Sequence, residues 1–172
     1  MIKLFKFEYT RVSIQIALIT NDTMKNLTKE ACLKLLSTNY IGRIAYIAQG
    51  SPDIIPITYF YDSEHHSIIT YSGPGGKIDA MRKNSSVSFQ VDEITTLDKW
   101  KSVLLYGEFE ELSGIDSKHQ LHVFSEGVKK VILKRENLNP QFISEFSSKI
   151  ESDSTPIVYR INILEIKGKQ RD

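Results

Sequence analysis

Several classes of protein are excluded by what this sequence lacks. Its 172 residues contain one cysteine, Cys32, which excludes an internal disulfide and a metal cluster built on several cysteines. The 22 Lys and Arg residues nearly balance the 21 Asp and Glu residues, leaving a net charge of +1. Such a chain has no global field that would recruit nucleic acid or an anionic membrane. Any anion-binding site must therefore be local.

Long hydrophobic runs are also missing. The apolar stretch at residues 12–20 is too short to span a bilayer, and Gln15 interrupts it. No small-residue cleavage site follows, so we do not expect a signal peptide. The lone cysteine fits a reducing cytoplasm, and we expect a cytoplasmic protein. The length suits one domain, which we place at residues 24–172 after an N-terminal extension at residues 1–23.

The familiar catalytic motifs are absent. The sequence has no Walker loop, no Gly-x-Ser-x-Gly elbow and no His-Glu-x-x-His helix. His119 and His122 could share a helix face, but no Glu or Cys completes a ligand set, so we expect no metal. Glu110 and Glu111 are adjacent on a predicted strand and point to opposite faces, which argues against a shared acid–base role.

Short apolar strands in near succession dominate what is present. Such strands with short links favour antiparallel pairing and a small barrel, because a parallel sheet would need helices between most strands. The fold class is therefore mainly β, with about six strands and helices packed outside. The predicted strands are residues 42–48, 53–62, 67–72, 87–91, 101–112 and 156–168, and the predicted helices are 28–38, 77–83, 117–134 and one that begins at Asn139-Pro140.

Three single residues carry structural predictions. Cys32 lies on the apolar side of helix 28–38 and is interpreted as a small buried hydrophobic residue. Pro56 cannot donate to a sheet ladder, so it indicates a sheet edge, a bulge or a place where a ligand replaces a neighbouring strand. Gly107, within a long strand, indicates a bend or a close approach of backbone.

Residues 70–84 read TYSGPGGKIDAMRKN and contain the strongest candidate for an anion site. We call residues 73–76, Gly-Pro-Gly-Gly, the glycine loop. The loop precedes Lys77 and a short helix, whose free N–H groups and macrodipole would favour an anion beside the lysine. By composition alone, a plain turn and a phosphate-binding loop both remain open.

Aromatic residues form the second candidate feature. Their ring faces and polar tips would suit a flat heterocycle, although packing inside the barrel is the favoured explanation for each of them except Trp100. Trp100 is the only tryptophan and begins a strand. The aromatic set is Tyr59, Phe60, Tyr61, Tyr71 and Trp100.

Taken in order, five segments resemble the FMN-binding split-barrel proteins related to pyridoxamine 5′-phosphate oxidase, especially the nitroimidazole-resistance branch. The resemblance covers residues 27–168. The segments that carry it are GRIAYI, PITYFYD, TYSGPGGKIDAMRKNSSVSFQVDE, WKSVLLYGEFEEL and VYRINILEIKGK.

The resemblance implies a six-stranded split barrel that forms a homodimer, with FMN bound at the interface. It implies that Lys77 contacts the FMN phosphate, with Tyr71 and Ser72 beside the cofactor. Trp100 and Ser102 are expected near the phosphate or the ribityl chain. The strand that runs along the isoalloxazine ring, largely through backbone groups, is Pro56, Ile57, Thr58 and Tyr59.

The function that the resemblance implies is oxidation and reduction through FMN, from NAD(P)H to a small flat acceptor such as a nitroaromatic or a quinone. Tyr71 is the candidate catalytic residue, and it stands where many nitroimidazole-resistance proteins have a histidine. The basic residues of vitamin B6 oxidases are missing from the last strand. A flavin carrier or redox sensor without turnover stays open, as does a barrel that binds haem or a deazaflavin.

Overall fold

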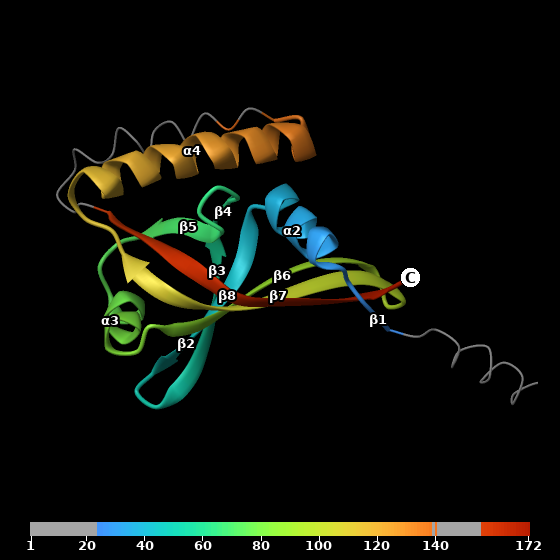
Figure 1. Cartoon of the computed structure of the whole chain (residues 1–172), viewed down its shortest axis with the longest axis horizontal. Coiled ribbons are helices and arrows are strands. Elements are labelled where there is room, and N and C mark those ends of the chain that lie inside the picture. Colours follow the sequence, from blue (N-terminus) through green and yellow to red (C-terminus); the bar gives the residue numbers. More distant parts are fainter. Residues whose placement is uncertain (1–23, 139, 141–155) are drawn as a thin grey trace, which may run out of the picture.

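A single antiparallel sheet dominates the structure, a computed structural model that describes residues 24–138, 140 and 156–172. In these residues seven strands follow the order β3-β2-β6-β7-β8-β5-β4, and β1 pairs with β8 (Figure 1). The predicted fold class, mainly β with helices outside an open antiparallel barrel, is confirmed. The strands are β1 (Lys25–Asn26), β2 (Ile41–Ala48), β3 (Ser51–Thr58), β4 (Phe60–Asp62), β5 (Ser67–Ser72), β6 (Ser86–Thr96), β7 (Lys99–Glu111) and β8 (Ile157–Arg171).

Three helices pack on the outside of the sheet in the described part of the chain. They are α2 (Lys29–Thr38), α3 (Gly76–Lys83) and the long α4 (Gly114–Glu136). Helix α4 lies along one side of the sheet, with α3 on the other side (Figure 1). Helix α2 begins as the sequence predicts, because the Thr28 hydroxyl accepts a hydrogen bond from the Ala31 amide at 3.2 Å.

The predicted strand 53–62 is in fact two strands, β3 and β4, separated at Tyr59. The Tyr59 amide donates to the Tyr40 carbonyl at 2.8 Å, and the Tyr59 hydroxyl donates to the Leu36 carbonyl at 2.8 Å. The amide bond continues the β2–β3 register by one residue, and after Tyr59 the chain changes partner, because β4 pairs with β5. This division and the short β1 raise the number of strands from the expected six to eight.

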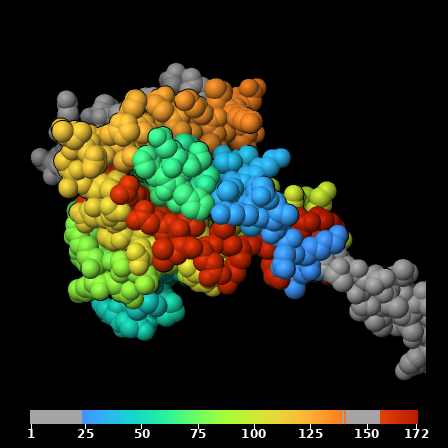
Figure 2. Space-filling view, viewed as in Figure 1, coloured from blue at the N-terminus to red at the C-terminus, as the bar shows by residue number. Residues whose placement is uncertain are grey.

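Two clusters of buried side chains form the core. The larger one fills the barrel and includes Cys32, which is 1% exposed, as predicted. The smaller one joins α4 to β5 through Ile69, Phe124 and Val128. In the space-filling view, β8 runs across the middle of the visible face (red in Figure 2). Since β8 pairs with both β7 and β5, it connects the two halves of the sheet.

Among the described strands the barrel is split, because β3, at one end of the strand order, pairs only with β2. Pro56 lies on this strand opposite Arg43, which confirms the prediction of a sheet edge. In the described part of the chain, a side chain and not a strand ladder joins β5 to β3. The Thr70 hydroxyl on β5 donates to the Thr58 carbonyl on β3 at 2.7 Å.

Two predictions about the ends of the chain lie outside the described residues: the N-terminal extension 1–23 and the helix beginning at Asn139-Pro140. In the described ranges, no helix combines the length and the apolar character needed to cross a bilayer. These ranges also hold no group of three or more potential metal ligands.

Candidate functional site

The glycine loop leads directly into the N-terminus of α3. Gly75 is the N-cap residue and makes no side-chain hydrogen bond to the helix. The first intrahelical bond runs from the Asp79 amide to the Gly75 carbonyl at 3.1 Å, so the amides between these residues have no intrahelical acceptor. A Cβ built at Gly73 or Gly76 would meet nothing within 4 Å. The loop therefore offers free donors with open space in front of them.

Lys77 adds the charge at this helix end. Its ammonium is half-buried and lies 5.9 Å from the centroid of the Tyr159 ring. Among the described residues no carboxylate lies within ion-pair distance of Lys77. Burial lowers the pKa of this lysine because water is removed from the charged form. An anion at the loop would supply the counter-charge that the protein does not.

Two acids at α3 and at the adjoining strand are paired with Arg82 and not with Lys77. Arg82, one turn further along α3, pairs with Asp79 at 3.2 Å and with Glu111 of β7 at 2.7 Å. These pairs also fix the C-terminal part of α3 against the sheet. The positive charge of Lys77 is therefore left for a ligand.

Tyr71 and Ser72 end β5 immediately before the glycine loop, and both are half-buried. The Tyr71 ring meets the Phe124 ring of α4 edge to face, with centroids 5.3 Å apart. Burial raises the pKa of the Tyr71 phenol, so it keeps its proton and remains a hydrogen-bond donor well above neutral pH. The contact with α4 was not predictable, because Phe124 is 53 residues away in the sequence.

The strand predicted to run along the flavin, residues 56–59, alternates between exposed and buried side chains, as a half-buried edge strand should. Pro56 and Thr58 are exposed, whereas Ile57 is buried. The Tyr59 side chain belongs to the core and packs edge to face on Phe89, with ring centroids 4.9 Å apart. Among these four residues, Pro56 and Thr58 present side chains to the surface, while Tyr59 can offer a ligand only its backbone carbonyl.

Trp100 and Ser102 lie at the opposite end of the molecule from Lys77. The Ser102 hydroxyl of β7 accepts a hydrogen bond from the side-chain amide of Gln90 at 3.1 Å, and Trp100 pairs across the sheet with Ile94. The other end of β7, at Glu111, pairs with Tyr159 beneath Lys77.

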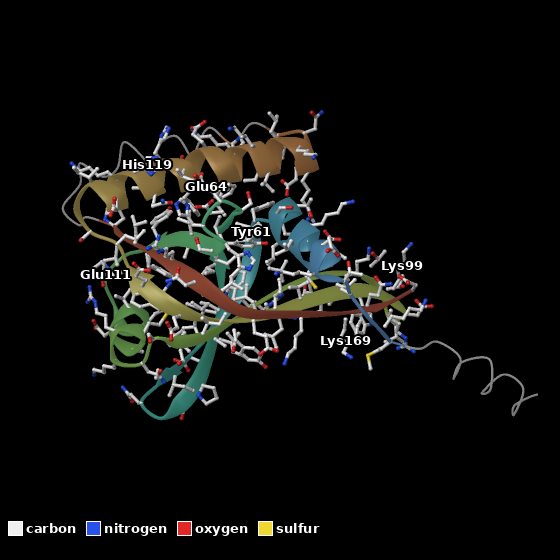
Figure 3. All side chains as sticks on the ribbon, viewed as in Figure 1. Tyr61, Glu64, Lys99, Glu111, His119 and Lys169 are labelled. Atoms are coloured by element: carbon white, nitrogen blue, oxygen red, sulfur yellow. The ribbon has the colours of Figure 1, made fainter. Side chains whose placement is uncertain are left out.

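Figure 3 displays this separation through its labels, with Glu111 near α3 and Lys99 at the far tip of the hairpin. The nine residue steps from Ser102 to Glu111 correspond to roughly 30 Å of extended strand. One protomer therefore cannot bring Ser102 and Lys77 to the same small ligand.

The sequence analysis did not identify two residues that lie at the end of the barrel next to the glycine loop. Thr70 joins β5 to the edge strand β3, and the Tyr159 ring lies under the Lys77 ammonium. The Tyr159 hydroxyl is buried beside the Thr70 side chain. Alternation in the last strand predicts that Tyr159 points inward, but only the register with β5 places it opposite Thr70.

The described residues define a split antiparallel barrel with a glycine loop and a half-buried lysine at a helix N-terminus. The family is shown directly: the family model for pyridoxamine 5′-phosphate oxidase matches residues 28–170. The chain belongs to this family.

Known relatives agree with this assignment. An uncharacterized protein from Rhizobium meliloti is 28% identical over 146 residues, covering 83% of this chain and 92% of the relative. The crystal structure of an FAD-binding protein from Mesorhizobium loti is similar with a TM-score of 0.66 and 28% identity, over 88% of this chain and 98% of that one.

A more distant structure has the same fold. It is a protein from Bacteroides thetaiotaomicron described as a candidate 5-nitroimidazole antibiotic resistance protein. Its TM-score is 0.64 at 16% identity, over 86% of this chain and 89% of that chain.

Proposed function

We propose that this protein binds FMN, with the phosphate at the glycine loop. The observation that carries the proposal is the half-buried Lys77 ammonium, which has no carboxylate partner in the described ranges and stands at the open N-terminus of α3. One lysine and one helix N-terminus match a single phosphate group. The family and the similarity to an FAD-binding protein support a flavin as the ligand.

We also propose that two copies of the chain share each flavin. Trp100 and Ser102 lie too far from Lys77 to act with it in one protomer, so a second copy would supply them. The sheet offers a surface for that copy. One row of cross-strand neighbours runs across β3, β2, β6 and β7, and it begins at the exposed Ile54 and ends at the exposed Tyr106. Ala45 and Ser88 lie between them. A depression of about 430 Å³ lies along this row. Exposed apolar surface of this kind is typical of protein interfaces.

The proposed activity is the transfer of electrons from NAD(P)H to a small flat acceptor such as a nitroaromatic or a quinone. A bound flavin would supply the redox chemistry, so the protein needs no acid, base or nucleophile set of its own. Lys77 and the loop amides would hold the phosphate. The exposed edge of β3 would lie along the ring, and the Tyr71 phenol would donate a hydrogen bond beside it.

Size-exclusion chromatography with light scattering and absorbance detection tests the flavin and the dimer together. We expect twice the chain mass of 19.7 kDa. The same peak should carry one flavin per protomer, with absorption bands at about 375 and 450 nm. Chromatography of the released cofactor then distinguishes FMN from FAD. A protein that stays colourless after FMN is added would contradict the flavin proposal, whereas a flavin-loaded monomer would contradict only the shared site.

Tyr71→Phe is expected to slow flavin reduction by NAD(P)H about tenfold, since one hydrogen bond to the flavin is lost. Stopped-flow absorbance at the flavin band measures the rate, and flavin content should not change. Tyr61→Phe is the matched control, because the Tyr61 hydroxyl is engaged with His66 at 3.0 Å. An unchanged rate in Tyr71→Phe would remove Tyr71 from the chemistry. No reduction in the wild-type protein would favour a flavin carrier or sensor.

A further inference from the structure

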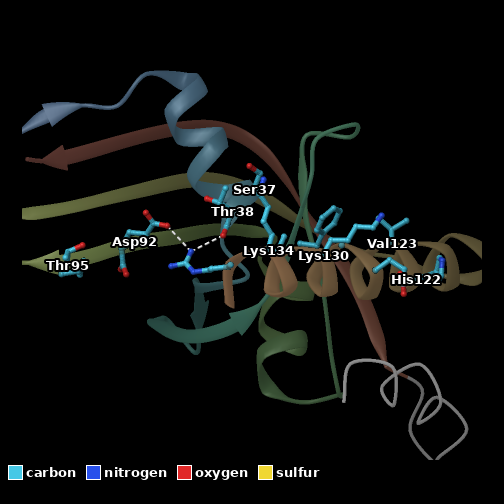
Figure 4. A pocket seen from close by; sticks show the side chains of 15 residues that line it. Ser37, Thr38, Asp92, Thr95, His122, Val123, Lys130 and Lys134 are labelled. Atoms are coloured by element: carbon cyan, nitrogen blue, oxygen red, sulfur yellow. Dashed lines mark hydrogen bonds and ion pairs between the residues drawn. The ribbon is translucent and has the colours of Figure 1, made fainter. Parts of the chain in front are cut away.

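A large cavity lies away from the glycine loop. It has a volume of about 1230 Å³ and is enclosed by α4, the C-terminal end of α2 and the end of β6 (Figure 4). Neither Lys77 nor Tyr71 lines it. This volume exceeds what most drug-sized ligands require.

One wall of the cavity is apolar and firmly packed. Val123 and Val131 line it from α4, and Phe60 lines it from β4. A Cβ at Gly127 would lie 2.3 Å from the Phe60 ring, so the ring rests directly on the helix backbone. Ile94 of β6 also lines the cavity although 71% of its surface is exposed. A flat apolar body would find surface on two sides.

The acidic groups at the cavity are all paired. Asp92 binds Arg43 at 2.9 Å, and Glu126 binds Lys129 at 2.8 Å. Both of these cations lie outside the lining. Glu93 is bound by a third cation, Arg135, at 3.1 Å. The acids therefore leave no net negative charge in the cavity.

Two cations remain. Lys130 and Lys134 project from successive turns of α4 into the lining, and neither forms an ion pair among the described residues (Figure 4). The C-terminal end of α2 carries a partial negative charge from the helix macrodipole. This charge does not neutralise the two lysines, because Arg135 donates to the Thr38 carbonyl there at 3.2 Å. The cavity combines apolar walls with a surplus of two ammonium groups.

We propose that this cavity is a second ligand site, which binds a flat aromatic ring bearing an anionic group such as a carboxylate or a phosphate. The ring packs against Phe60, Val131 and Ile94, and the anion lies between Lys130 and Lys134. The site does not depend on the flavin, because its residues differ from those at the glycine loop.

Isothermal titration calorimetry with 2-naphthoate and its uncharged analogue 2-naphthamide tests the charge. We expect the wild-type protein to bind naphthoate roughly tenfold more tightly than naphthamide, since two ammonium groups act on the carboxylate. The double variant Lys130→Met/Lys134→Met keeps the aliphatic stems and should lose this preference. Lys83→Met/Lys118→Met removes two exposed charges outside the cavity and should retain it.

A second pair of variants tests the position of the ring. Ile94→Asn should weaken both naphthalene ligands several-fold, whereas Leu97→Asn, at an 89% exposed position on the same hairpin, should weaken neither. Flavin absorbance should be the same in all variants, so a loss of the flavin site is recognised separately. Three results would overturn the proposal: no saturable binding, equal affinity for the two ligands, or full naphthoate affinity in Lys130→Met/Lys134→Met. A cavity filled by another part of the chain or by a second copy would give the first of these.

Discussion

Lys77→Ala is expected to weaken FMN binding by roughly ten- to hundredfold, because a hydrogen bond between charged groups contributes about 1.5–3 kcal/mol. The loss falls in this range because the ammonium is half-buried and has no competing carboxylate among the described residues. Quenching of FMN fluorescence on titration into flavin-free protein measures the affinity. The thermal midpoint should change little, since Lys77 holds no ion pair in the described fold.

Lys83→Ala is the matched control, since it removes one exposed charge from the other end of the same helix. It should leave FMN affinity within about twofold of the wild type. If Lys77→Ala also bound FMN with unchanged affinity, the glycine loop would be a plain turn and the phosphate would lie elsewhere.

The affinity should also depend on pH with a defined sign. The ammonium is charged below its pKa, and burial lowers that pKa from the ordinary value of 10.5. FMN affinity should therefore be constant near neutral pH and should fall as the pH rises through the lowered pKa of Lys77. The Lys77→Arg variant should keep its affinity in that higher range, because arginine stays charged. The stability of the flavin-free protein should change with pH in the opposite direction. In that window the unfolded chain binds more protons, so the free energy of unfolding rises with pH.

Gly107→Ala is expected to destabilise the fold by about 3 kcal/mol, the upper part of the range for an overpacked core position. A Cβ there would lie 2.5 Å from the Asn162 carbonyl oxygen and 2.7 Å from a methyl group of Ile161. The first of these is backbone in β8, which cannot move without breaking the β7–β8 ladder. The register of that ladder shifts between Tyr106 and Gly107, which marks a bulge at this point. Urea unfolding followed by circular dichroism measures the difference.

Gly73→Ala provides the contrast for this stability measurement. A Cβ at Gly73 would meet nothing within 4 Å, so the free energy of unfolding should stay within about 0.5 kcal/mol of the wild type. Equal stability of Gly107→Ala and Gly73→Ala would mean that the β7–β8 ladder adjusts to a side chain at Gly107 with no penalty.

The sequence by itself determined the parts of this protein that depend on neighbours in the chain. Alternation and short links predicted the antiparallel strands, and Thr28 marked the start of α2. Pro56 marked a sheet edge and Gly107 a close approach, because each is a local backbone property that the packing preserves. The resemblance named the family, which is shown.

Only the tertiary structure decided which of these pieces meet. The strand predicted at residues 53–62 divides at Tyr59 because β3 pairs with β2 whereas β4 pairs with β5, and a local pattern cannot predict this change of partner. Strand register places Ser102 far from Lys77, and the proposal that a second copy completes the site rests on this separation. The cavity under α4 is formed by segments from residue 37 to residue 135, so no window of the sequence contains it.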